Sequence, residues 1–183
     1  MGTETDLGYS IDRYEAEMDA QDYIRGFRRA DYFIKLCQEC GNYGRRYGCP
    51  PFEEDPLAAI NRYAHIHIIG VKIVPNDRSL PLKAVHQLMK PVTDKLNEEL
   101  LAMEMSSGGK AYGFAGSCPY CDGEPCARID SKPCRHPDKV RPSLEAIGFD
   151  ISKTAKDVLG LEIKWSKGDV VPEYLTLVCG LFY

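Results

Sequence analysis

The apolar positions of the chain recur with helical spacing in five segments, which are therefore predicted helices. They cover residues 19–40, 56–63, 81–107, 141–148 and 150–160. Asp55 and Asp150 stand before two of them as N-caps, because a carboxylate accepts hydrogen bonds from the first free N–H groups of a helix. A break is expected near Gly26, and Pro91 should kink or divide the longest helix, which Gly108 should end.

Short runs of β-branched or alternating apolar residues predict four strands. The runs are residues 65–74, 110–116, 161–166 and 173–183. Because they alternate with helices, the expected fold is α/β, with a small mixed or parallel sheet flanked by helices. The cysteine-rich segments fall between these elements and are expected to form metal-binding loops at one end of the sheet.

Charge divides the chain into an acidic N-terminal arm and one domain. Residues 1–22 carry seven acidic side chains against Arg13 alone, which predicts a solvated or loosely ordered arm. Residues 23–183 show neither a linker nor a repeat of solenoid length, and they suffice for one hydrophobic core. They are predicted to form a single cysteine-rich metal-binding α/β domain.

The chain shows no targeting or membrane signal. Its first residues form no basic and apolar leader, and no apolar run approaches the length of a membrane span. A cytoplasmic protein without a membrane partner is therefore expected, in a compartment that keeps thiols reduced. The net charge of −4 gives no general basis for binding nucleic acid.

Seven of the eight cysteines fall into two groups whose spacing suits a metal. The first group, C-x2-C-x8-C, consists of Cys37, Cys40 and Cys49. The second group, C-x2-C-x4-C-x7-C, consists of Cys118, Cys121, Cys126 and Cys134. A gap of two residues lets two sulfurs converge on one centre, and the surrounding glycines and prolines permit tight turns. The reducing compartment and the length of the chain disfavour a disulfide framework.

Two kinds of metal centre remain open. Zinc is tetrahedral and typically takes two C-x2-C pairs, which would leave three of these seven thiols unused. Iron–sulfur clusters accept irregular spacings and a proline after a ligand cysteine, and proline follows both Cys49 and Cys118. The pattern favours iron–sulfur, as one or two [4Fe-4S] clusters, with zinc as the alternative.

The number of cysteines in each group distinguishes the possible functions. The second group can hold a cubane alone, whereas the first leaves either one iron without a thiolate or a site shared between the groups. An electron-transfer protein or accessory redox factor is the first hypothesis, and an open-iron enzyme acting on a small anionic substrate is the second. A zinc-stabilised interaction module is the third. No nucleophile elbow, phosphate loop or dinucleotide fingerprint is present, so catalytic residues are unassigned. The expected partner is a redox protein or a small anionic ligand, and nothing indicates the oligomeric state.

Other polar residues could serve the same site. Four are possible anion-binding residues because arginine suits bidentate contacts: Arg45, Arg46, Arg135 and Arg141. Three tyrosines among the cysteines could shield a cluster from water: Tyr43, Tyr47 and Tyr120. His136 could ligate, but a single loop histidine is more often neither ligand nor proton donor. His65 and His67 are interpreted as polar strand positions. Cys179 alternates in phase with apolar residues of the last strand and is expected to be buried, not a ligand.

Two stretches resemble a known family. They are "YFIKLCQECGNYGRRYGCPPFEEDP" and "GSCPYCDGEPCARIDSKPCRHPDKVRPSLEAIGFDISKTAKDVLG". They resemble a cysteine-rich family of predicted metal-binding proteins, domain of unknown function 2284, over nearly the whole chain past the acidic arm. The resemblance implies a stand-alone metal-binding domain without an assigned reaction. It also supports the seven cysteines of the two groups as ligands.

Overall fold

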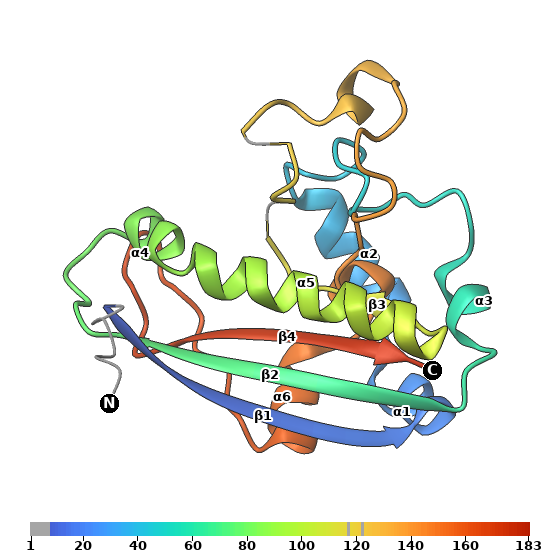
Figure 1. Cartoon of the computed structure of the whole chain (residues 1–183), viewed down its shortest axis with the longest axis horizontal. Coiled ribbons are helices and arrows are strands. Elements are labelled where there is room, and N and C mark those ends of the chain that lie inside the picture. The colour runs from blue at the N-terminus through green and yellow to red at the C-terminus, as the bar shows by residue number, and fades with distance from the viewer. Residues whose placement is uncertain (1–7, 117, 122) are drawn as a thin grey trace.

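The structure, a computed structural model, describes residues 8–116, 118–121 and 123–183. Its sheet has four strands in the order β1-β2-β4-β3 (Figure 1). The strands are β1 (Tyr9–Asp19), β2 (His65–Pro75), β3 (Lys110–Tyr112) and β4 (Leu175–Phe182). Every neighbouring pair in this sheet is antiparallel. The prediction of a mixed or parallel sheet is therefore wrong, although the single α/β domain is confirmed.

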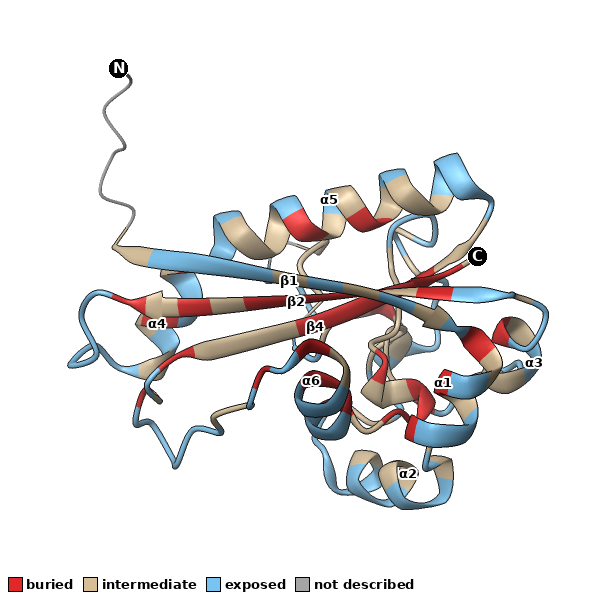
Figure 2. Ribbon diagram, turned by 90° about the horizontal axis from the view of Figure 1, so that it is seen from below, coloured by how far each residue is buried: buried red, intermediate tan, exposed pale blue. Residues whose placement is uncertain are grey.

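The sheet lies between two layers of helices (Figure 2). The helices are α1 (Ala20–Phe27), α2 (Ala30–Glu39), α3 (Pro56–Ile60), α4 (Leu82–Leu88), α5 (Lys90–Ser107) and α6 (Ile151–Leu159), with the 3-10 turns η1 (Ala127–Asp130) and η2 (Glu145–Ile147). Helix α5 covers one face of the sheet, while α1 and α6 cover the other (Figure 2). No helix in the described part of the chain is long and apolar enough to cross a bilayer.

Strand β2 is the centre of the fold because both of its faces are buried. Ile66 and Ile68 pack with α1 and α6 residues, whereas Ile69, Val71 and Ile73 pack with α5 residues. A strand buried on both faces reads as a nearly continuous apolar run, as residues 65–74 do. Each fully buried isoleucine contributes about 1.5–3 kcal/mol of hydrophobic free energy. The two cores therefore hold the sheet and its helices together.

The helical predictions are largely confirmed, because local signals fix them. Asp55 and Asp150 accept hydrogen bonds from the N–H groups of Leu57 and Lys153 as N-caps. The long helix is divided into α4 and α5, with Pro91 in the first turn of α5. The break between α1 and α2 falls at residues 28–29, just after Gly26, where Arg28 pairs with Phe149.

Three predicted segments differ in the structure. Residues 161–166 form no strand, and of residues 141–148 only Glu145–Ile147 is helical, as a 3-10 turn. The prediction of a loosely ordered acidic arm is wrong for residues 9–19, since they form β1 along the whole length of β2. Residues 1–7 of that arm lie outside the described residues. Apolar residues at every second position of β1, Tyr14, Ala16 and Met18, pack on the core that contains α1 and α6.

The sheet is antiparallel because the last strand separates two strands that run in the same direction. Strands β2 and β3 are joined through α4 and α5, as in a βαβ unit. Strand β4 pairs with both of them, antiparallel to each. The connection thus has the split βαβ form. Alternation of helices and strands along the chain does not reveal such an insertion.

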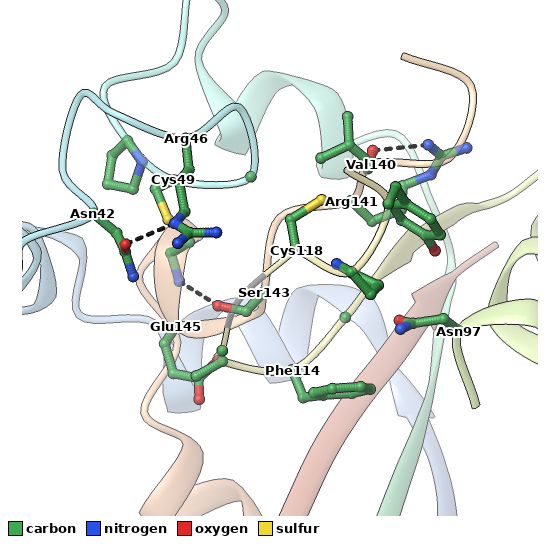
Figure 3. A pocket seen from close by; sticks show the side chains of 18 of the residues that line it. Asn42, Arg46, Cys49, Asn97, Phe114, Cys118, Val140, Arg141, Ser143 and Glu145 are labelled. Atoms are coloured by element: carbon green, nitrogen blue, oxygen red, sulfur yellow. Dashed lines mark hydrogen bonds between the residues drawn. The ribbon is translucent and has the colours of Figure 1, made fainter. Parts of the chain in front are cut away.

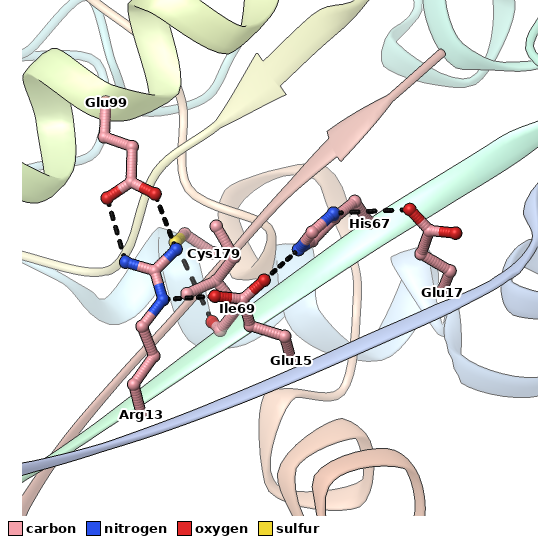
Figure 4. Close-up of polar contacts among 7 residues, drawn as sticks. All are labelled: Arg13, Glu15, Glu17, His67, Ile69, Glu99 and Cys179. Atoms are coloured by element: carbon pink, nitrogen blue, oxygen red, sulfur yellow. Dashed lines mark hydrogen bonds and ion pairs between the residues drawn. The ribbon is translucent and has the colours of Figure 1, made fainter.

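The charged side chains of β1 face α5 and are paired there (Figure 4). Arg13 donates to both carboxylate oxygens of Glu99, at 2.8 and 2.6 Å, and also to Glu15. Glu15 lies 2.9 Å from Nε2 of His67, whose Nδ1 is 3.5 Å from Glu17. Charges on an edge strand also discourage pairing with a further chain. The acidic residues Glu15 and Glu17 of β1 thus lie beside basic side chains on the face of the strand toward α5.

Candidate metal centre

The two cysteine groups lie in neighbouring segments above α5, where the loop after α2 meets the loop of residues 115–140 (Figure 1). Cys37 is in the last turn of α2, and Cys40 is its C-cap residue. Cys126 is the N-cap residue of η1. All eight cysteines are free thiols, and the seven of the two groups are partly or fully accessible. The structure therefore brings the two predicted groups to one end of the molecule.

Helix α2 is docked by the turn that follows η2. Gly148 has φ +99°, and a Cβ atom there would lie 2.7 Å from Cα of Ala30, the first residue of α2. The Gly148 carbonyl accepts from Arg29 N–H at 2.7 Å. Only glycine combines this conformation with so close an approach. The contact fixes the helix that carries Cys37 and Cys40 against η2.

Arg128 joins the two cysteine loops. From η1 its guanidinium donates to the carbonyls of Arg46 at 2.8 Å and Cys49 at 2.6 Å, and also to that of Pro51. It also lies 5.7 Å from the ring centroid of Tyr47. A second contact between the loops runs from the Tyr47 hydroxyl to a carbonyl of the second loop at 2.5 Å. One cation therefore satisfies three backbone acceptors of the first loop.

A cavity of about 200 Å³ lies between the loops and α5 (Figure 3). Its cysteines are the three of the first group and one of the second: Cys37, Cys40, Cys49 and Cys118. Arg46 also lines it, and its Nε donates to the Asn42 side chain at 2.7 Å. Thiols from both loops thus face one enclosed space.

The thiols that raise one another's pKa belong to the same sequence group. Burial raises the pKa of Cys37 and Cys49, and the charge of Cys40 raises both further. Burial also raises the pKa of Cys118, which a hydrogen bond from the Tyr120 backbone opposes. The thiols that raise it further are the rest of the second group: Cys121, Cys126 and Cys134. Partly buried thiols crowded in this way favour a bound cation, because metal binding requires thiolates.

The donor set suits a centre bound by sulfur. The His136 N–H lies 3.4 Å from Sγ of Cys134, so the backbone provides a donor to this sulfur, as the Tyr120 N–H does for Cys118. Among residues 8–116, 118–121 and 123–183, no three His, Cys, Asp or Glu side chains lie close enough to hold a single ion. The thiols and these backbone donors fit a group bound through sulfur.

Glu145 is a carboxyl group that the sequence analysis did not single out. Its Oε2 atom is fully buried and has no hydrogen-bond partner among the described residues. Burial raises the pKa of Glu145 to about 7, against the effect of hydrogen bonds from its own N–H and Ser143. It lies across the cavity from Asn97 (Figure 3) and interacts electrostatically with Cys37. An acid with one oxygen lacking a partner among the described residues thus lies near Cys37 of the first cysteine group.

The four predicted anion-binding arginines differ in their distance from the cavity and in their contacts. Arg141 lines the cavity, but its guanidinium contacts Glu104 through two bonds of 2.9 and 2.5 Å. Burial would raise the pKa of Glu104, but the hydrogen bonds from Arg141 and from Ala111 N–H lower it overall. Arg46 lines the same cavity, and Arg45 is exposed in the same loop.

Arg135 lies in the second loop and donates to the carbonyl of Pro125 at 2.9 Å. A hydrogen bond to the Cys121 thiol is the main cause that raises the pKa of Arg135. It is thus a neighbour of the second cysteine group and not a residue of the cavity wall.

The remaining candidates are also placed. Tyr43 and Tyr120 line the cavity beside the cysteines. His136 lies beside Tyr120, with ring centroids 6.3 Å apart. Cys179 is fully buried on the α5 face of β4, and its thiol points to the carbonyl of Ile69 at 3.7 Å (Figure 4). The prediction that Cys179 is buried in the core is confirmed.

The residues that sequence reasoning missed act through contacts distant in the chain. No role was predicted for Arg128 from the sequence, and nothing local marks its acceptors 77 to 82 positions away. Glu104 lies in the long helix, 37 positions from Arg141. For Glu145 there was a weak signal, a single acid within the apolar "SLEAIGF".

Comparison with known proteins gives one match. Residues 27–181 match the family described as Predicted metal-binding protein (DUF2284). No curated protein and no solved structure is similar to the chain at a significant level. The match includes all seven grouped cysteines and the elements that position them, from the end of α1 to β4. The chain therefore belongs to the DUF2284 family of predicted metal-binding proteins.

Proposed function

We propose that the protein binds iron–sulfur clusters of the [4Fe-4S] type through its two cysteine groups. The observation that carries the proposal is the docking of the two loops by Arg128, which gathers seven free thiols at one end of the domain. Membership of a family predicted to bind metal supports the broader statement. The [4Fe-4S] assignment rests on the thiols and their neighbours.

The arrangement of the thiols favours a cluster over zinc. A zinc ion holds four ligands about 2.3 Å from one point when they are sulfurs, whereas a cubane carries its cysteines on separate irons. No three potential ligands of the described residues converge within the reach of one ion. A zinc site would also leave three grouped thiols without a role.

The second group has the four thiols that a cubane takes. The first group has three, and Glu145, whose Oε2 atom has no hydrogen-bond partner among the described residues, lines the cavity beside them. When bound, such clusters supply reversible one-electron transfer. Arg46 and Arg128 lower the pKa of Cys49, so these cations offset part of the negative charge of the thiolates.

The role that follows is electron transfer to a redox partner protein, or service as an accessory redox factor in the cytoplasm. The second candidate is an enzyme with an open iron that acts on a small anionic substrate. The cavity beside the three-cysteine group favours this candidate, because one iron there would lack a thiolate. Arg46 and Arg141 line this cavity and are the proposed contacts for the anion, whereas Arg45 and Arg135 would reach an anion only from the loop surface outside the cavity wall.

Metal and sulfide analysis of anaerobically purified protein tests the proposal. We expect iron and acid-labile sulfide in equal amounts, about four or about eight of each per chain, with broad visible absorption. Paramagnetic resonance of the reduced protein should count the clusters. Stoichiometric zinc without sulfide would overturn the proposal and favour a zinc-stabilised interaction module.

A further inference from the structure

A second cavity of about 500 Å³ adjoins the cysteine cavity on its α4 side. We call it the α4–α5 groove; its walls are α4, the first two turns of α5, residues 163–166 and the start of β4. Asn97, Phe114 and Pro119 line both cavities. A molecule held in the groove would therefore have one end next to the cysteine loops.

The groove carries uncompensated positive charge. Lys90 and Asp94 form an ion pair at 2.5 Å, and Lys164 pairs with Glu162 at 2.6 Å. Lys83 and His86 on α4 line the groove and have no ion-pair or hydrogen-bond partner among the described side chains. Since Asp94, which lines the groove, is already paired with Lys90, an anion is the ligand complementary to Lys83.

The rest of the lining is apolar and includes an exposed aromatic ring. Trp165 has 69% of its surface accessible, although it lies in a wall that also contains Phe114, Leu175 and Leu177. A flat apolar body placed there would cover the indole, and stacked aromatic pairs are stabilised beyond the burial of their surface. The ligand should therefore be planar as well as anionic.

Two polar groups in the walls can contact a ligand. The Oγ1 atom of Thr176 is buried and has no hydrogen-bond partner among the described residues. The Asn97 amide points from α5 toward the cysteine cavity (Figure 3). A buried hydroxyl without a partner is destabilising, and a ligand that supplies a partner would remove this cost.

We propose that the α4–α5 groove binds a planar aromatic carboxylate. Its carboxylate pairs with Lys83 and accepts a hydrogen bond from the His86 ring, its ring covers Trp165, and its far side approaches Asn97 and the cysteine cavity. This site differs from the four arginines of the cysteine loops. It does not depend on which metal those loops hold.

Trp165 is the only tryptophan of the chain, so it can report occupancy by itself. Full-length, metal-loaded protein labelled with 5-fluorotryptophan should give one fluorine resonance. We expect this resonance to shift saturably with 2-naphthoate, and calorimetry to show at least about fivefold weaker binding of the neutral 2-naphthalenemethanol. No saturable shift, or equal affinity for both compounds, would overturn the proposal.

Variants separate the site from general effects of charge. Lys83→Gln should weaken 2-naphthoate binding about fivefold and leave binding of the neutral alcohol unchanged. Lys95→Gln is the matched control, because Lys95 is an exposed α5 lysine outside the groove lining. Equal weakening by both variants would refute the charge assignment.

Thr176→Val tests the unpartnered hydroxyl. It should weaken binding of both compounds, because the carboxylate and the hydroxymethyl oxygen are each proposed to accept a hydrogen bond from the Thr176 hydroxyl. It should not lower the melting temperature, since the buried hydroxyl has no partner to lose among the described residues. Unchanged binding would remove Thr176 from the site. Metal and sulfide content should be the same in all three variants, so failure of this proposal is distinguishable from failure of the iron–sulfur proposal.

Discussion

Replacing Arg128 should release the two cysteine loops from each other while leaving the sheet intact. Arg128→Ala removes a donor to three backbone carbonyls: those of Arg46, Cys49 and Pro51. A hydrogen bond to a charged group contributes about 1.5–3 kcal/mol when well buried. Arg128 is half-exposed, so we assign about 1 kcal/mol to each bond. The loops should then open more easily by about 3 kcal/mol, which is about a hundredfold in the opening equilibrium.

Hydrogen exchange followed by mass spectrometry measures this opening directly. Peptides of residues 41–51 and 123–134 should exchange about a hundredfold faster in Arg128→Ala, while peptides from β2 and β4 keep their protection. In Arg128→Lys the loop peptides should exchange at a rate between those of the wild type and Arg128→Ala, because lysine keeps the charge but lacks the planar donors that serve several acceptors. Iron content should fall in the same order.

Arg45→Ala is the matched control, since Arg45 lies in the same loop, is exposed, and forms no side-chain contact among the described residues. Two results would contradict the reasoning. One is equal exchange in Arg128→Ala and Arg45→Ala. The other is equal loosening of the loops and the sheet, which would mean that Arg128 supports the whole fold and not the junction of the loops.

Three further predictions concern buried groups. Glu104→Gln should lower the free energy of unfolding by about 2 kcal/mol at pH 7 by weakening the pair with Arg141. The pKa of Glu104 is lowered in the folded state. Urea titrations should therefore show this loss shrinking as the pH falls below about 4. Burial raises the pKa of Glu145 to about 7. The free energy of unfolding of metal-free protein should therefore fall by up to about 3 kcal/mol between pH 4 and 7. Glu145→Gln should abolish this dependence on pH in the same titrations. Cys121→Ser should lower the iron content whereas Cys179→Ala should not, and elemental analysis showing equal loss in both would refute the separation of Cys179 from the ligands.

The parts of the fold that sequence predicted are those set by contacts between near neighbours in the chain. The N-caps at Asp55 and Asp150, the division of a helix at Pro91 and the glycine at the end of α6 all act within one helical turn. Strand β2 was equally visible because burial on both faces gives a continuous apolar run.

Strand direction could not be predicted in the same way. It depends on β4 inserting between β2 and β3, a pairing across about 70 and 110 residues of chain. Strand β1 was missed for another reason. Its alternation of Tyr14, Ala16 and Met18 with charges is a strand signal, but the acidic residues were interpreted as a solvated arm. In the structure Glu15 and Glu17 face α5 beside His67 and Arg13.

The same distinction between local and distant contacts applies to the candidate site. The spacing of the cysteines in the sequence predicts their two groups, and the thiols that interact electrostatically in the structure are the members of each group. Arg128 and Glu145 reach the site only through folding. Sequence could show that cations lie near the second group, but it could not show that one of them binds carbonyls of the first.

The distribution of burial explains why these loops depend on polar contacts. Among their described residues, segments 40–55 and 115–140 bury only Pro50 and Ala127, whereas β2 alone buries five large apolar side chains: Ile66, Ile68, Ile69, Val71 and Ile73. Loops that bury so little apolar surface gain little hydrophobic free energy to offset the entropy of ordering them. The sheet can therefore form without the loops, while the loops rely on polar contacts such as those of Arg128. Under the iron–sulfur proposal, thiolate ligation would add to these contacts, so metal-free protein should keep the sheet and loosen the loops.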